Sequence, residues 1–198
     1  VHLKGPFFLT QALLPLIDAD QDIAVGLATD LLQEFPARFG IAWRRGMRAK
    51  LGLTTEQDGD GELIDDLLST MHEQSSDHTQ MFRALSSEVR GERTPVLDQL
   101  ADRTALDAWL GRYAARLATE ARPPEDVAAA MDQANPVYIP RNHLVEEALA
   151  AATEGDLDPV EQLVDVLRQP FDERPGVHRY ALPANTGFIE GYQTFCGT

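Results

Sequence analysis

Apolar residues recur three and four positions apart over most of this sequence, a spacing that places them on one face of an α-helix. No comparable run of alternating β-branched residues occurs, so any sheet would be small or confined to the last thirty or so positions. The sequence therefore predicts a mainly α fold with about eight helices. The stretches with the clearest pattern of buried apolar positions are 63–71, 106–117, 144–152 and 160–167.

Helix boundaries are marked by capping residues, prolines and glycines. Asp158, Pro159 and Glu161 have the form of a capping box with proline in the first turn, which predicts a helix ending near Gln169. Thr104 is a second candidate start. Further boundaries are expected at Pro123–Glu125 (a start), Gly52 and Gly155 (ends), with two more helices at about 20–35 and 76–89.

Residues without helical periodicity gather in two places. The stretch 54–61 is acidic and rich in glycine, and the tail 170–198 carries prolines and glycines. We therefore expect a loop at the first and a long irregular C-terminal tail at the second. There is no internal repeat or low-complexity tract, so composition gives no reason to expect a domain boundary.

The charge balance excludes some classes of partner. The 198 residues include 32 acidic and 17 basic side chains, for a net charge of −15. Nucleic-acid binding requires a basic surface, so we expect no nucleic-acid partner. No apolar run is long enough to span a membrane and no secretory signal is visible, which favours a cytoplasmic protein without a membrane partner.

Metal and catalytic motifs are missing from the sequence pattern. The DGDG stretch at 58–61 does not fit a calcium loop, which needs ligands at alternating positions, then a glycine and a distant glutamate, whereas here glycine already occupies the second position; a solvated turn is favoured. The five histidines show no zinc-ligand spacing, and there is one cysteine. No nucleophile elbow or glycine-rich phosphate loop occurs. We assign no catalytic, cofactor-binding or metal-binding residue.

A basic segment at 37–51 has two interpretations. Its apolar residues fall on one stripe, and its arginines point away from that stripe. The basic face could bind phosphate or an acidic partner. It could equally be a solvated face neutralised by the acidic segment 56–77, and this second interpretation is favoured. The stripe comprises Phe39, Trp43, Met47 and Leu51, and the basic face comprises Arg44, Arg45 and Arg48.

The segment NPVYIPRN, Asn135 to Asn142, places two prolines before a helix. Pro140 disfavours helical geometry in the preceding residue, which holds Arg141 and Asn142 near the first turn. We expect Asn142 to cap the helix. We expect Arg141 to clamp carbonyls or a carboxylate of a neighbouring helix, a structural role that is favoured over substrate contact. Asn135, Pro136, Tyr138, Arg141 and Asn142 form a candidate structural motif.

Four motifs in order carry a resemblance. Met47-x-x-Lys50-Leu51-Gly52-Leu53, Asp77-x-Thr79-x-x-Phe82-Arg83-x-Leu85, Asn-Pro-x-Tyr followed by Arg141-Asn142, and the terminus YQTFCGT resemble the C-terminal part of selenoprotein O-like protein adenylyltransferases. The resemblance covers 11–198. Residues 1–10 depart from it and are interpreted as an atypical segment, which leaves open a truncated gene, a fusion junction or a wrongly chosen start. Residues 3–15 are similar to a mid-domain segment of short-chain dehydrogenases, but the cofactor motif of those enzymes is missing.

The resemblance implies a protein-kinase-like fold of which this chain is the helical C-terminal portion. It implies an activity that transfers AMP from ATP, with Mg or Mn, to hydroxyl side chains of protein substrates. The family's nucleotide- and metal-binding residues match nothing here, so we expect a fragment that is non-catalytic alone and has a missing N-terminal kinase-like region as its partner. Apolar surface meant for that partner would favour self-association. The alternative is an independent helical protein-interaction module that uses Arg44, Arg45 and Arg48.

The resemblance also gives Cys196 a candidate role. In the family, a cysteine or selenocysteine near the C-terminus is associated with redox control through a bond to a cysteine of the kinase-like part. Nothing next to Cys196 in the sequence would lower the pKa of its thiol, so an unreactive terminal cysteine is the equal alternative.

Overall fold

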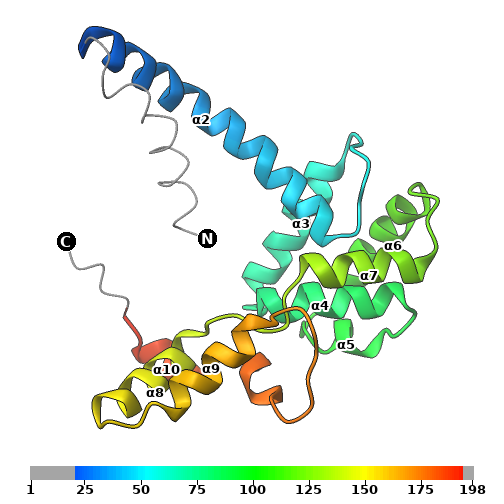
Figure 1. The fold of residues 1–198 in the computed structure, drawn as a ribbon. Coiled ribbons are helices and arrows are strands. Elements are labelled where there is room, and N and C mark those ends of the chain that lie inside the picture. Colours follow the sequence, from blue (N-terminus) through cyan, green and yellow to red (C-terminus); the bar gives the residue numbers. More distant parts are fainter. Residues whose placement is uncertain (1–20, 194–198) are drawn as a thin grey trace. The chain divides into compact units, whose positions relative to one another are not determined.

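The computed structural model describes residues 21–193, which form helices joined by loops and contain no strand (Figure 1). The predicted mainly α fold is confirmed for these residues. None of the helices in this range is long and apolar enough to cross a membrane. In chain order the elements are α2 Gln21–Lys50, α3 Asp60–Glu73, α4 His78–Val89, α5 Thr94–Leu97, α6 Arg103–Ala118, α7 Pro124–Ala134, α8 Asn142–Thr153, α9 Asp158–Arg168, η2 His178–Ala181 and α10 Thr186–Gly191.

The chain divides into two compact units, Val1–Gly46 and Met47–Thr198. Composition indicated no boundary at this place, and the limits 1–10 and 11–198 drawn from the sequence stay a prediction. Composition gives no sign of the division because helix α2 passes through it without a loop, a glycine-rich stretch or a change in helical periodicity.

Helix α2 is longer than predicted. The expected helix at 20–35 was to end before Pro36, but α2 continues through Pro36 to Lys50. Proline lacks an amide hydrogen, so it removes one helical hydrogen bond at a cost of about 3 kcal/mol. Helix α2 continues through Pro36 because the turns on either side keep their own hydrogen bonds.

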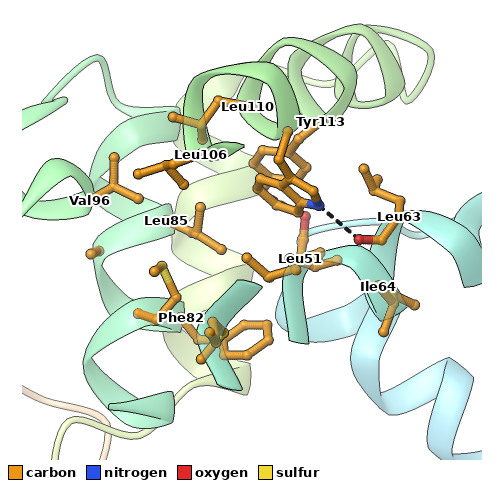
Figure 2. Packing of buried hydrophobic residues seen from close by; sticks show 14 of the residues in the cluster. Leu51, Leu63, Ile64, Phe82, Leu85, Val96, Leu106, Leu110 and Tyr113 are labelled. Carbon is orange, nitrogen blue, oxygen red and sulfur yellow. Dashed lines mark hydrogen bonds between the residues drawn. The ribbon is translucent and has the colours of Figure 1, made fainter. Parts of the chain in front are cut away.

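The first core of the second unit lies among α3, α4, α6 and α7 (Figure 2). Trp109 and Tyr113 of α6 stack with ring centroids 4.9 Å apart and are almost fully buried. Trp109 Nε1 donates to the carbonyl oxygen of Leu63 at 2.8 Å, the dashed line in Figure 2. Tyr113 Oη donates to the carbonyl oxygen of Leu51 at 2.9 Å. Both buried aromatics therefore satisfy their polar atoms with backbone of neighbouring segments.

A second core lies around α8, α9 and η2. Two side chains of the predicted stripes lie outside it, because Leu149 is 54% exposed and Val164 is 43% exposed. Helices α8 and α9 contact each other through a narrow face. Leu149 and Val164 lie at the edge of this contact and are therefore exposed. The buried members are Val137, Tyr138, Leu144, Ala148, Leu163, Val166 and Tyr180.

The C-terminal tail is more regular than expected. The described part of 170–198 contains two short helices, η2 and α10, so the predicted irregular tail is interrupted by regular structure at these places. Tyr180 anchors η2, because its ring is buried in the second core and its hydroxyl lies 3.2 Å from Gln162 Oε1. A single aromatic contact of this kind leaves no periodic signal in the sequence.

Two predicted caps are made by a neighbouring residue. Helix α9 begins at Asp158 as expected, but Asp156 Oδ1 accepts from the amide of Asp158 at 3.0 Å, and Asp158 caps nothing. Likewise Asp102, one residue before α6, accepts from the amide of Thr104 at 2.9 Å. Aspartate and threonine are both good capping residues, so sequence alone does not choose between adjacent candidates.

The two predicted helix-ending glycines are confirmed. Gly52 has φ of 73° and Gly155 has φ of 92°, in the left-handed region that favours glycine. Gly52 is also tightly packed, because a Cβ atom there would lie 2.5 Å from Val127 Cγ1. Only glycine fits at this position without displacing α7.

Candidate functional site

The residues 135–141 connect α7 to α8 and carry the two prolines of the candidate motif. Their main chain is anchored to the loop that follows α9. The amides of Val137 and Tyr138 both donate to the carbonyl oxygen of Pro170, at 2.7 and 3.1 Å. The hydroxyl of Tyr138, a buried residue, accepts from the amide of Arg174 at 3.1 Å. Hydrogen bonds to main-chain atoms of residues 170 and 174 therefore hold this segment in place, independently of its charged side chains.

Arg141 ends this segment and forms a two-point ion pair with Asp77. Its Nη1 lies 2.8 Å from Asp77 Oδ2, and its Nη2 lies 3.1 Å from Asp77 Oδ1. Nη2 also donates to the carbonyl oxygen of Ala181 at 2.9 Å, and Arg141 is only 7% exposed. The guanidinium thus has the carboxylate and carbonyl contacts that were expected of it.

Asp77 has two tasks. It is the N-cap of α4, where its Oδ1 accepts from the amide of Gln80 at 2.9 Å, and it is the partner of Arg141. Burial raises the pKa of this carboxyl, but the hydrogen bonds from Arg141 and from the Gln80 amide outweigh burial and hold the pKa below its ordinary value of 3.8. Asp77 is therefore ionised at neutral pH.

Asn142 does not cap α8, and that prediction was wrong. Helix α8 begins at Asn142 itself, and Arg141 occupies the N-cap position without a side-chain cap. The amides of Leu144 and Val145 bond instead to the carbonyl oxygen of Arg141, each at 3.0 Å. The side chain of Arg141 does not cap the helix because its guanidinium binds Asp77 instead. Arg141 therefore both ends the extended segment and makes the long-range contact.

Asn135, at the other end of the segment, forms a reciprocal pair with Lys50. Its Nδ2 donates to the carbonyl oxygen of Lys50 at 2.8 Å, and its Oδ1 accepts from Lys50 Nζ at 3.1 Å. Asn135 is 1% exposed, so both ends of its amide are satisfied within the protein. This pair joins the end of α2 to the end of α7.

The Lys50 ammonium lies in a partly buried aromatic setting. Its Nζ is 5.3 Å from the centroid of the Phe82 ring, which in turn lies 4.6 Å from the ring of His78. Burial lowers the pKa of Lys50. Burial, and then the charge of Lys50, lower the pKa of His78, so His78 is mainly neutral at pH 7.

Arg83 contacts the end of α7 beside Asn135. Its Nη1 lies 3.0 Å from Asp132 Oδ1 and its Nη2 lies 3.1 Å from Glu173 Oε1. Arg90, the residue that directly follows α4, binds the other oxygen of Asp132 at 2.6 Å, so Arg83 and Arg90 share one carboxylate of α7. Helices α4 and α7 are therefore joined by charge as well as by apolar packing.

Three of the sequence motifs thus meet around 135–141. The first supplies Lys50, the second supplies Asp77 and Arg83, and the third supplies Asn135 and Arg141. Sequence reasoning predicted the class of partner for the Arg141 guanidinium but not which residue it would be. Asp77 belongs to the second motif, and no local sequence pattern connects it with Arg141, which lies 64 positions away.

A hollow of about 380 Å³ lies beside the start of α8. Its lining includes Asp77, Arg141, His143, Phe188 and Tyr192. Phe188 stacks on Tyr192 with centroids 4.8 Å apart, and its ring meets His143 edge-on at 5.8 Å. Burial and the charge of Arg141 lower the pKa of His143, so the hollow presents a neutral imidazole at pH 7.

A second polar cluster, which sequence reasoning missed, surrounds Glu120. Its carboxylate accepts from the amide of Thr54 at 3.0 Å, from the hydroxyl of Thr55 at 2.6 Å and from Arg116 Nη1 at 2.8 Å. Burial raises the pKa of Glu120, but these hydrogen bonds outweigh burial and hold its pKa far below the ordinary value of 4.5. The cluster fixes the acidic loop against the end of α6.

The same cluster corrects the interpretation of the DGDG stretch. Asp60 is not part of a solvated turn but the first residue of α3, and it is 3% exposed. Its Oδ1 accepts from Arg116 Nε at 2.6 Å. The partner lies 56 residues away, so the local composition could not indicate that this acid is buried.

The basic face of 37–51 is not a single face. Arg44 and Arg45 are exposed as expected, but Arg48 is 8% exposed and its Nη2 lies 2.9 Å from Glu56 Oε2. Of the predicted apolar stripe, Met47 and Leu51 are buried whereas Phe39 and Trp43 are exposed. Arg48 is therefore not solvated as expected, but its partner Glu56 belongs to the acidic segment 56–77 that was expected to neutralise these arginines.

Within 21–193 no group of three or more histidine, cysteine, aspartate or glutamate side chains is arranged to hold a metal ion. Cys196 and most of the YQTFCGT motif lie outside the described residues.

Comparison with known proteins identifies the family. The family model described as "Protein adenylyltransferase SelO" matches residues 8–168. The chain is 47% identical over 190 residues to "Protein nucleotidyltransferase YdiU" of Cereibacter sphaeroides strain KD131, covering 96% of this chain and 38% of the relative. It is 45% identical over 194 residues to the protein of the same name from Mycolicibacterium paratuberculosis, covering 95% of this chain and 38% of the relative.

A third relative of that name, from Chromobacterium violaceum, is 46% identical over 192 residues, covering 95% of this chain and 40% of the relative. The chain therefore spans less than half the length of these curated relatives. The resemblance seen in the sequence motifs is confirmed by the family match and by these identities. The chain belongs to the family of protein adenylyltransferase SelO.

Proposed function

We propose that this chain is the helical C-terminal part of a protein adenylyltransferase, and that it braces the part of the enzyme that binds nucleotide. The intact enzyme would transfer AMP from ATP to hydroxyl side chains of other proteins, with Mg or Mn as the metal ion. On this proposal the chain alone is not catalytic. Its partner is the remaining kinase-like region, and the enzyme acts in the cytoplasm, where ATP is abundant.

The observation that carries the proposal is that the polar residues of the family motifs bind one another. Both terminal nitrogens of Arg141 are taken by Asp77 and the Ala181 carbonyl. Both ends of the Asn135 amide are taken by Lys50. An arginine that grips a phosphate needs free donors directed at the ligand. The terminal nitrogens of Arg141 are already used inside the protein, and its Nε, which has no partner, is buried. These contacts support a role in holding helices in place.

The length of the relatives supports the same proposal. Proteins named nucleotidyltransferase contain this region as 38–40% of their length, so most of each relative lies outside the region that this chain matches. Transfer of AMP requires groups that hold the triphosphate and neutralise the charge that develops on it. We assign those groups to the remaining part.

The test compares the chain alone with a chimera. In the chimera this chain replaces the matching region of the Cereibacter sphaeroides relative. Both are incubated with ATP labelled on its α-phosphate, with Mg or Mn, and with a mixture of proteins. We expect label on protein from the chimera and none from the chain alone. Transfer by the isolated chain would overturn the proposal, and ATP binding measured by calorimetry would show whether nucleotide binding accompanies it.

A matched pair of variants separates bracing from direct chemistry. Arg141→Ala in the chimera should lower the melting temperature and the activity together, and activity should return when the protein is assayed at a temperature where it is fully folded. Arg179→Ala removes an exposed ion pair with Glu147 and should change neither. Loss of activity by a fully folded Arg141→Ala chimera would indicate a direct catalytic contact and contradict the bracing role.

A further inference from the structure

The second unit contains two bodies with separate cores. The first body runs from Met47 to Asn135 and encloses the core of α3, α4, α6 and α7. The second body runs from Val137 to Gln193 and encloses the core of α8, α9 and η2. The helix pairs in most extensive contact lie within one body, such as α4 with α7 and α8 with α9. Apolar packing therefore stabilises each body more than it joins the two.

Polar contacts cross from one body to the other. Arg141 pairs with Asp77 at 2.8 and 3.1 Å, and Arg83 Nη2 lies 3.1 Å from Glu173 Oε1. Gln80 Nε2 also donates across the boundary, at 3.5 Å to a main-chain oxygen of η2. Polar boundaries within a chain permit relative motion, because their groups exchange protein partners for water at little net cost. The boundary between the two bodies is of this kind.

A hollow of about 480 Å³ lies between the two bodies. Thr79, Arg83 and Ser87, spaced four residues apart on α4, line it from the first body, and Tyr138 and Arg174 line it from the second. The smaller hollow beside the start of α8 also has lining residues from both bodies. Protein interiors are close-packed, so hollows along a boundary show that the two surfaces are not tightly fitted. The boundary therefore leaves room for relative motion.

One short segment of chain connects the bodies, and its anchors change at Pro136. Asn135 is held by the first body, through its hydrogen bonds with Lys50 at 2.8 and 3.1 Å. Val137 is held by the second body, because its amide donates to the carbonyl oxygen of Pro170 at 2.7 Å. Changes in backbone angles at a few residues between two anchored segments are enough to rotate one body against the other. Pro136 has the position of such a hinge.

We propose that the second body rotates about Pro136 relative to the first, and that the Arg141–Asp77 pair holds the closed arrangement of this structure. In the open arrangement the pair is broken and the hollow between the bodies is wider. Opening exposes both charged groups to water, which offsets the lost ion pair, so both arrangements are populated. The motion belongs to this chain alone and does not depend on the proposed enzymatic activity.

The test measures distances between pairs of spin labels in the full chain by double electron–electron resonance. Cys196 is the one cysteine of the sequence, so Cys196→Ser provides the background for labelling. Labelled cysteines replace the exposed residues Asp98 and Glu154 to report across the boundary, or Asp98 and Asp126 to report within the first body. We expect two distances across the boundary and one within the first body. A single distance across the boundary, or equal spread for both pairs, overturns the proposal.

Asp77→Asn tests the pair that holds the closed arrangement. Asparagine is also a good N-cap residue, so the variant keeps the cap of α4 while it removes the charge that binds Arg141. We expect the ratio of open to closed molecules to rise about fivefold or more, because charge-assisted hydrogen bonds stabilise the closed arrangement alone. The matched control Asp107→Asn removes an exposed ion pair with Arg93 inside the first body and should leave the ratio unchanged. An unchanged ratio in Asp77→Asn overturns the proposal.

Pro136→Gly tests the position of the hinge. Proline fixes its own φ angle, whereas glycine leaves it free, so we expect a wider spread of distances across the boundary. The matched control is Pro183→Gly, which lies within the second body between η2 and α10 and should leave the spread unchanged. Equal effects of the two variants, or no effect of Pro136→Gly, contradict a hinge at this residue.

Discussion

Arg141 and Asp77 lie 64 residues apart in the sequence, yet two nitrogens of the guanidinium meet two oxygens of the carboxylate at 2.8 and 3.1 Å. Asp77 begins α4, which packs in the first core, whereas Arg141 precedes α8, which packs in the second. The pair therefore joins the two cores of this unit. Because the same carboxylate caps α4, loss of the pair affects a helix as well as a contact.

Arg141→Ala should lower the free energy of unfolding by about 1 to 3 kcal/mol, because it leaves Asp77 and the Ala181 carbonyl without their partner. Urea denaturation measures this change. The matched control is Arg179→Ala, whose ion pair with Glu147 is exposed and should contribute less than about 1 kcal/mol. Equal stability of the two variants would show that the Arg141–Asp77 pair contributes no more to the free energy of unfolding than an exposed ion pair does.

Much of this arrangement follows from local sequence, and the rest does not. Helical periodicity and the prolines around Arg141 predict the elements and the presence of a clamp, because both depend on residues within a few positions. The partners Asp77, Lys50 and Glu120 are chosen by how helices pack, and their separations of 64, 85 and 65 or more residues leave no local trace. The same reason explains why Asp60 was expected in a solvated turn.

Acid should destabilise the fold through Glu120 and Asp77. The pKa of Glu120 lies below its ordinary value of 4.5, and the pKa of Asp77 lies below its ordinary value of 3.8. Each carboxylate therefore contributes fully to the free energy of unfolding only when the pH is above its ordinary pKa. As the pH falls below about 4.5, protons bind the unfolded chain first and this stability is progressively lost. Urea midpoints between pH 7 and pH 3 should show the decline.

Glu120→Gln should be less stable at pH 7 and should lose less stability on acidification, because it removes the group with the larger depression of pKa. The exposed Glu147→Gln is the control and should keep the native pH dependence. An unchanged slope for Glu120→Gln would mean that other carboxylates control acid unfolding.

Gly52→Ala should destabilise the protein by about 3 kcal/mol. The left-handed backbone at φ 73° costs a residue with a Cβ about 1 to 2 kcal/mol, and crowding against Val127 adds to that cost. Gly155→Ala has φ of 92° with nothing within 4 Å of the new Cβ, so it isolates the backbone term. Thermal denaturation of the two variants should differ by the crowding term, and equal melting temperatures would show that α7 moves aside freely.

The pair of Asn135 and Lys50 can be separated by a double-mutant cycle. Asn135→Ala removes the donor to the partly buried Lys50 carbonyl and should cost about 2 kcal/mol, because that carbonyl then loses its partner. Lys50→Met keeps the aliphatic packing on Phe82 while removing the ammonium, whose burial already lowers its pKa, and should cost about 1 kcal/mol or less. The double variant should recover about 0.5 to 1 kcal/mol relative to the sum of the single changes, since the two side chains share one hydrogen bond. Unfolding in urea at pH 7 gives all three values, and strict additivity would show that Asn135 acts only through the Lys50 backbone.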